Sequence, residues 1–371
     1  MESKAGGGVT YQNVGSEYFE KRGLKRHARV WSLWALGVGA VISGEFSGWN
    51  FGIASGGFGG LFIAAMIIAV MYLGLSFSLA EMSPALPHTG GAYSFARSTM
   101  GPWGGFITGL AESIEYVMTP AVIVFFIGSY LTGIFETPAA MQPLYWVGSY
   151  AIFVTLNYWG VELSFKVSVV VTLLALAVLA FFFVSAAPHA DFDRWALNIG
   201  VGADGKMIEL PNGGGPFLPF GLPGAFAAMP FAVWLYLAIE ELPLAAEESH
   251  DPARDMPKGL LLGIATLIVS AISYALQGIS FILLRIKKPD IHRPFRSPFG
   301  IPGAAATVLI ALWTLDYQLQ DPAYVKGVYA ALAWYVAGLL YFAFVGRHRL
   351  ILSPEEAFAM GQAPPAESPA K

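Results

Sequence analysis

The sequence predicts an all-α integral membrane protein, and two observations support that prediction. Hydrophobic residues make up 56% of the 371 positions and charged residues 12%, against about 25% charged residues in soluble domains. The apolar residues also gather in runs long enough to cross a bilayer as helices, which takes about 20 residues. The charges lie mostly in the connections between these runs, so their distribution across the membrane matters more than the net charge of -4.

Polar residues fill positions 1–30, and no short apolar core with a small-residue cleavage site occurs there, so no signal peptide is expected. Five basic residues precede the first apolar run: Lys21, Arg22, Lys25, Arg26 and Arg29. Because basic residues stay on the cytoplasmic side, this cluster predicts a cytoplasmic N-terminal segment and an integral protein of a bacterial-type inner membrane.

The first span, Trp31–Phe58, is predicted to be discontinuous. Glycines punctuate it, and Glu45 lies at its centre between Gly44 and Gly48. Glycine weakens a helix, and a carboxylate at bilayer depth is costly, so the two together indicate backbone that opens to line a cavity.

Four further spans follow before a long polar loop. They are expected at about Leu61–Leu86, Trp103–Phe135, Leu144–Gly160 and Val167–Ala187, with the loop HTGGAYSFARSTMGPWGG between the first two of these. The connection at 136–143 has no Lys or Arg and is predicted to be external, as is the loop 188–219. That loop contains Gly200–Lys206, GVGADGK, but Met207 stands where a phosphate-binding loop needs Ser or Thr, so a turn around Asp204–Gly205 is predicted instead.

The sixth span, Phe217–Ala246, is predicted to be interrupted like the first. Pro223, Gly224 and Pro230 weaken its first half, and Glu240 and Glu241 lie in its second half. Breaks in spans one and six are what a five-helix unit repeated with inverted topology produces, and such breaks mark the substrate site of a secondary transporter.

The last third of the chain conflicts with simple topology. The run Gly259–Leu284 is too short for two crossings, so a single crossing would place the basic loop RIKKPDIHRPFRSPFG outside. The positive-inside rule predicts the opposite for that loop. The same conflict between helix count and basic charge applies to two further spans, about Ile301–Leu319 and Tyr324–Val345. An odd number of helices missing within the seventh run would explain it.

Several segments together resemble the amino acid-polyamine-organocation transporter superfamily, and within it the ethanolamine permeases. They are GVGAVISGEFSGWNFG, ALPHTGGAYSFAR with GPWGGFITGLAESIEY, AIEELPLAAEESHDPARDMPKG and RPFRSPFGIPGA. The resemblance covers most of the chain from Trp31 to Val345 and implies an inverted five-helix-repeat fold of twelve spans, of which this chain offers about nine. It therefore implies an internal deletion near Ser270–Ser273 that removes the eighth and ninth helices and truncates the second repeat.

This comparison divides the chain into six expected parts. They are a cytoplasmic segment 1–30, a first repeat 31–187, an external loop 188–219, a truncated second repeat 220–285, a basic loop with two helices 286–345, and a polar cytoplasmic-type tail 346–371.

The first break is the expected substrate site, at Ile42, Ser43, Gly44, Glu45 and Phe46. In amino acid members of the superfamily, exposed amides at this break receive the substrate carboxylate. Glu45 would repel a carboxylate and attract an ammonium group, which favours an amine without an acid group. The alternative is that Glu45 is paired or protonated and structural.

Two other spans supply candidate site residues. Glu112 and Glu115 are three apart on one face of the third span, where close carboxylates suit cation binding or proton coupling, although Glu115 could equally be a solvated boundary residue. Tyr116 is expected to meet the substrate hydroxyl. Phe231 and Trp234 could form an aromatic face over the ammonium, or simply pack.

Glu240 resembles a gating or proton-sensitive position of the family, whereas Glu241 is expected near the cytoplasm and solvated. The sequence thus predicts a permease for a small amine, with ethanolamine as substrate, working by alternating access with a coupled proton or an exchanged solute. An amino acid permease and a truncated homologue that transports nothing are the alternatives. No enzyme motif occurs, and neither a cofactor, a metal nor a nucleic-acid partner is expected.

Overall fold

The computed structural model describes residues 3–5, 8–12, 27–86, 90–204, 207–211, 213–246, 248–266, 273–287, 289–291, 293–320 and 322–351. It gives the backbone alone at 3–5, 43–47, 161, 195, 207, 259, 261–266, 273–278, 320 and 322–328. The described residues are mostly helical, as predicted for an all-α membrane protein.

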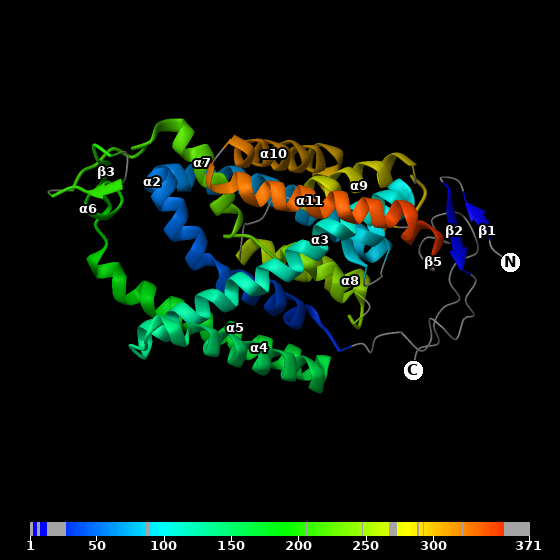
Figure 1. The fold of residues 1–371 in the computed structure, drawn as a ribbon, viewed down its shortest axis with the longest axis horizontal. Helices are drawn as coiled ribbons and strands as arrows, with labels where there is room; N and C mark the ends of the chain where they lie inside the picture. The colour runs from blue at the N-terminus through cyan, green and yellow to red at the C-terminus, as the bar shows by residue number, and fades with distance from the viewer. Residues whose placement is uncertain are drawn as a thin grey trace.

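Helices run along the long axis of the molecule (Figure 1). The longer helices are α2 (Val30–Ala85), α3 (Gly91–Ile134), α4 (Gln142–Trp159), α5 (Val161–Ala186), α7 (Gly221–Val233), α8 (Pro252–Thr266), α9 (Ser273–Lys287), α10 (Gly300–Gln320) and α11 (Pro322–Phe344). Short helical turns are η1 (Ala139–Met141), η2 (Ala187–His189), α6 (Phe192–Trp195), η3 (Ile239–Ala245) and η4 (Gly346–His348).

The two ends of the long axis carry small sheets. At one end, which we call the sheet end, β2 (Val9–Gln12) pairs antiparallel with β1 (Ser3–Ala5) and parallel with β5 (Leu350–Ile351). At the other, which we call the loop end, β3 (Ile199–Val201) and β4 (Met207–Glu209) form an antiparallel hairpin within the predicted loop 188–219. This hairpin agrees with the turn predicted there, although residues 205 and 206 lie outside the described part.

Helix α2 contains the first two predicted spans. Its helical geometry is broken at Gly57 (φ 69°, ψ −179°), a conformation that glycine adopts without steric cost. From this apex the two arms, 30–56 and 58–85, run toward the sheet end (Figure 1). Phe58, beside the apex, packs on Phe192 and Phe217 at the loop end, with ring centroids 5.6 and 6.1 Å away.

The break expected around Glu45 is not found in the structure. Residues 43–47 continue the α-helix, although their side chains are not described. The prediction of opened backbone at Glu45 is therefore wrong, and the observed kink in α2 is at Gly57.

Two other segments differ from the sequence-based boundaries. The stretch expected as a loop before the third span is helical from Gly91, and α3 is kinked at Gly101 (φ 77°), next to Pro102. In the seventh apolar run, expected as one span, the described residues form α8 and α9, and 267–272 between them lie outside the described part.

Within the described part of the chain, five helices are long and apolar enough to cross a membrane: Gly48–Ala85, Gly91–Ile134, Glu162–His189, Gly300–Leu319 and Tyr329–His348. On α5, Phe181 is 76% and Phe183 74% exposed. Exposed apolar faces of this size suit lipid tails and not water, so the structure supports an integral membrane protein.

The core lies along α2. Its second arm packs antiparallel against α10, and small residues let the two backbones approach closely, as in membrane helix pairs generally. A Cβ atom at Gly74 would meet the carbonyl of Gly303 and the hydroxyl of Thr307, which donates to Met71 O at 2.9 Å. This arm and α10 form the scaffold against which the broken sixth span is held.

Candidate functional site

The sixth predicted span is interrupted, as its prolines and glutamates indicated. Helix α7 ends at Val233, and the chain resumes as the 3₁₀ segment η3 at Ile239. Between them Ala238 has a φ of 86°, in the left-handed region that residues with a side chain rarely adopt. Strain of this kind costs about 1–3 kcal/mol and persists where the surroundings hold it, commonly at functional sites.

Helix α2 lies directly against this break. A Cβ atom at Gly48 would come within 2.9 Å of Phe231 O and 3.0 Å of Trp234 Cβ. The glycine thus allows the first predicted span to touch the end of α7, so the first span and the break in the sixth meet in space.

A cavity of about 270 Å³ opens at this junction. Its lining comes from α2, α3, the break and η3: Ala40, Val41, Tyr116, Thr119, Pro120, Ile123, Trp234, Leu237, Ala238, Glu241 and Leu244. No Lys or Arg is among these lining residues, so the charged group that faces the cavity is a carboxylate.

Four carboxyl groups from two elements converge beside the cavity. Glu112 is 5% exposed, and Tyr116 Oη donates a 3.2 Å hydrogen bond to its Oε1. Glu115 lies beside Glu240, which is only 2% exposed. Glu241, the neighbour of Glu240 on η3, is the member of this group that lines the cavity wall.

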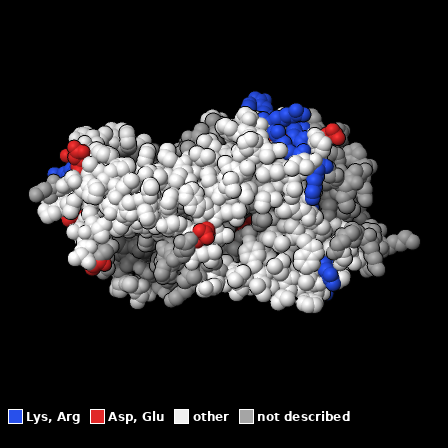
Figure 2. Space-filling view, turned by 90° about the horizontal axis from the view of Figure 1, so that it is seen from above, with Lys and Arg blue, Asp and Glu red and all other residues white. Residues whose placement is uncertain are grey.

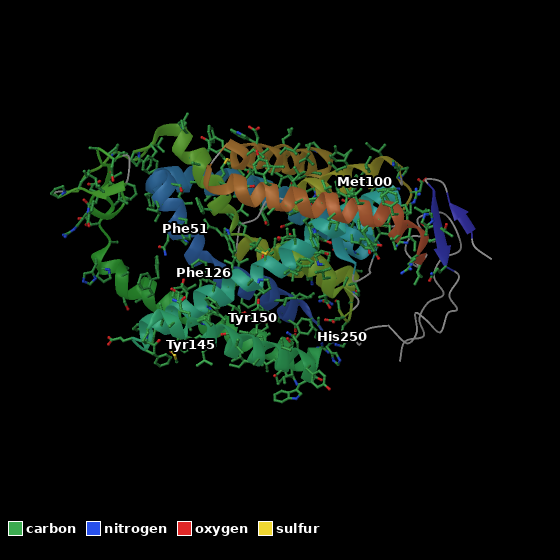
Figure 3. All side chains as sticks on the ribbon, in the orientation of Figure 1. Phe51, Met100, Phe126, Tyr145, Tyr150 and His250 are labelled. Carbon is green, nitrogen blue, oxygen red and sulfur yellow. The ribbon has the colours of Figure 1, made fainter. Side chains whose placement is uncertain are left out.

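The two aromatic candidates, Phe231 and Trp234, have different surroundings in the structure. Trp234 lines the cavity. Phe231 instead stacks on Phe51 of α2, with ring centroids 5.8 Å apart and planes at 26°. Phe51 is labelled in Figure 3. Ile42 packs at the edge of the core, and the side chains of Ser43, Gly44, Glu45 and Phe46 lie outside the described residues.

Glu241 is the residue that sequence reasoning missed. It was placed near the cytoplasm and solvated, yet it faces this cavity and also a second one of about 400 Å³ between α2, α5 and η3. Leu244 lines both cavities as well, and the second cavity extends to Glu248, whose carbonyl accepts from His27 N and Ala28 N at 2.8 Å. The sequence did contain a signal for Glu241, because it is next to Glu240 in a span predicted to be broken.

An all-helical membrane bundle with a cavity at an interrupted helix has the architecture of a secondary transporter. Comparison with protein families agrees: the model of the amino acid permease family matches residues 33–341. The chain belongs to that family.

Among its relatives is an uncharacterized transporter of Rhizobium meliloti (strain 1021), 30% identical over 246 residues, which are 64% of this chain and 49% of the relative. A branched-chain amino acid permease of Bacillus subtilis (strain 168) is 26% identical over 70% of this chain and 56% of the relative. A D-serine/D-alanine/glycine transporter of Escherichia coli (strain K12) is 27% identical over 74% of this chain and 58% of the relative. The chain thus spans about half the length of the curated relatives it matches.

Proposed function

We propose that this chain binds a small primary amine, with ethanolamine as the substrate, and moves it across the membrane by alternating access. The observation that carries the proposal is the carboxylate-lined cavity at the break between α7 and η3. Its volume of about 270 Å³ lies just below the roughly 300–1,000 Å³ of pockets for drug-sized ligands, which suits a metabolite of a few heavy atoms.

The cavity offers the groups that an amino alcohol needs. Glu241 would pair with the ammonium, and the ring of Trp234 would face the cation from another wall, a contact worth about 2 kcal/mol when desolvated. Tyr116, which already donates to Glu112, presents a hydroxyl for the substrate alcohol. A substrate carboxylate would meet the carboxyl group of Glu241 and no Lys or Arg among the lining residues.

The pair Glu115 and Glu240 supports coupling to protons. Two neighbouring carboxyl groups that are shielded from water share a proton more readily than they carry two negative charges. Both side chains lie beside the group that would hold the substrate cation. Arrival of an ammonium near this pair would favour release of that proton, which is the elementary step of exchange between a cation and a proton.

An amino acid permease is the second candidate, and the relatives favour it. The family and the printed names of the Bacillus and Escherichia relatives refer to amino acids. For this chain that reading requires a binding site for the substrate carboxylate. Residues 43–47 are helical, so their backbone amides are engaged within α2 and the carboxylate would have to bind elsewhere.

Uptake by the purified chain in proteoliposomes tests the proposal. Labelled ethanolamine should accumulate above the level of empty vesicles, and unlabelled alanine should compete poorly. Glu241→Gln should raise the half-saturation concentration about tenfold, because a hydrogen bond or ion contact to a charged group contributes about 1.5–3 kcal/mol.

Glu162→Gln is the matched control, since Glu162 is an exposed carboxylate paired with Lys166 on α5. It should leave uptake unchanged. Competition by alanine as strong as by ethanolamine would favour the amino acid permease, and uptake no higher than in empty vesicles would contradict transport by this chain.

A further inference from the structure

Helix α8 begins, and helix α9 ends, on the same side of the molecule. Ahead of α8, Ala28 forms a parallel bridge with Ser249, and His250 N donates to Ala28 O at 3.0 Å. Asp255 in the first turn of α8 accepts from Asp251 N at 3.2 Å and from Ser249 Oγ at 3.3 Å. The start of α8 is therefore fixed beside the first residues of α2.

The other end of the pair, the end of α9, is held by a buried carboxylate. Glu81, near the end of the second arm of α2, has a side chain that is 0% exposed. Arg285 donates to both of its oxygens, at 3.0 and 2.7 Å, and Ser297 N donates to Oε2 at 2.6 Å. Arg293 Nε lies 3.2 Å from Oε1. We call Glu81, Arg285, Arg293 and Ser297 the Glu81 clamp.

The Glu81 clamp lies at the sheet end. Helix α9 is also bonded to α3, where Lys287 Nζ donates to Thr99 O at 3.0 Å. Arg97, in the same turn of α3, donates to Ile351 O of β5 at 2.7 Å and lies over the ring of Tyr11 in β2. Lys and Arg side chains are concentrated toward this end of the molecule (Figure 2).

The run from Pro252 to Lys287 has 36 residues. Even as continuous helix it would be about 54 Å long at 1.5 Å per residue, short of the about 60 Å that two crossings of a hydrocarbon core of about 30 Å require. Helix α10 provides an internal comparison: it has 21 residues, starts just after the Glu81 clamp, and near its far end Tyr317 Oη donates to Pro223 O at 3.0 Å. Pro223 is in the first turn of α7, which follows the loop 188–219, so α10 does reach the loop end.

We infer that α8 and α9 form a re-entrant pair. The pair enters the membrane from the side of the sheet end, stops part-way and returns to that side. The basic loop 285–299 then lies on the same side as the N-terminal segment, α10 and α11 cross outward and back, and β5 returns to β2. This removes the conflict between helix count and positive charge with no additional helix. The inference does not depend on the substrate.

Cysteine accessibility tests this topology directly, because the chain contains no cysteine and needs no background removal. Three exposed positions serve: Asp204→Cys in the loop 188–219, Arg254→Cys at the start of α8, and Asp290→Cys after α9. A membrane-impermeant maleimide is applied to intact cells and to permeabilised cells, with the full-length chain.

The re-entrant pair predicts that Asp290→Cys reacts under the same condition as Arg254→Cys and under the opposite condition to Asp204→Cys. A single crossing predicts that Asp290→Cys reacts together with Asp204→Cys, and that result, or reaction of Asp290→Cys under both conditions, overturns the inference. Pro298→Cys, also exposed, repeats the measurement on the other side of the Glu81 clamp should Asp290→Cys fail to accumulate.

Discussion

At the scale of single residues, buried acids in this protein have two different settings. Glu81 is surrounded by two guanidinium groups and a backbone amide, so its charge is compensated within the fold. Glu112, Glu115, Glu240 and Glu241 instead gather from α3 and η3 beside a cavity whose described lining has no Lys or Arg. The first arrangement stabilises structure, and the second is suited to a mobile cation or proton.

Glu81→Ala should strongly destabilise the protein, because it leaves Arg285 and Arg293 without their common partner. Breaking a buried ion pair by removing one member costs about 3–5 kcal/mol. The free energy of unfolding, from chemical denaturation in detergent, measures the effect. Glu162→Ala, which removes an exposed pair on α5, should change it little, and equal losses for the two variants would contradict the buried role of Glu81.

At the scale of elements, glycine decides how closely helices approach. Gly48 brings α2 to the break after α7, and Gly74 brings the second arm of α2 to Gly303 of α10. Glycine also supplies the positive φ angles that turn α2 at Gly57 and α3 at Gly101. The kinks in these two helices thus both lie at glycines, although the sequence predicted the break in α2 at Glu45, twelve residues earlier.

Gly74→Ala should lower the midpoint of thermal unfolding in detergent. The added methyl group would collide with the Gly303 carbonyl and Thr307, and overpacking of this kind costs about 1–3 kcal/mol. Gly133→Ala, at a helical position of α3 where a Cβ meets nothing within 4 Å, should leave the midpoint unchanged or raise it. A lower midpoint for both variants would mean that loss of glycine itself, and not the helix contact, is responsible.

At the scale of the whole molecule, contacts distant in sequence place the ends of the chain together. The strand β2 near the N-terminus pairs with β5, which follows the last long helix, and Arg97 links both to α3. The loop 188–219 lies at the opposite end, against the apex of α2. One end of the long axis is therefore basic and carries the strands β2 and β5 from near the two ends of the chain. The other end is formed by the loop 188–219.

The pair Gln12→Cys and Ile351→Cys should form a disulfide on mild oxidation, because these residues are register partners in adjacent strands. Electrophoresis before and after reduction would detect the cross-linked form by its altered mobility. Gln12→Cys with Asp204→Cys is the matched control and should not cross-link. Equal cross-linking of both pairs would contradict the separation of the two ends.

The sequence by itself determined the membrane class, the interruption of the sixth span and the acidic chemistry of its second half. These follow from composition, from run length and from proline and glutamate inside an apolar stretch, all of which are local properties. Glu112, Tyr116, Trp234 and Glu240 were also selected as candidates this way, because helical spacing and neighbouring breaks mark them.

Only the tertiary structure decided which of these groups share a cavity. Glu241 faces Trp234 and Tyr116 because η3 turns at Ala238, and Phe231 turns instead to Phe51, which no local pattern encodes. The partners of Glu81 lie more than 200 residues away in the sequence. Charge pairing over such separations depends on how helices pack, so only the packed structure could reveal that α9 returns to the side from which α8 starts.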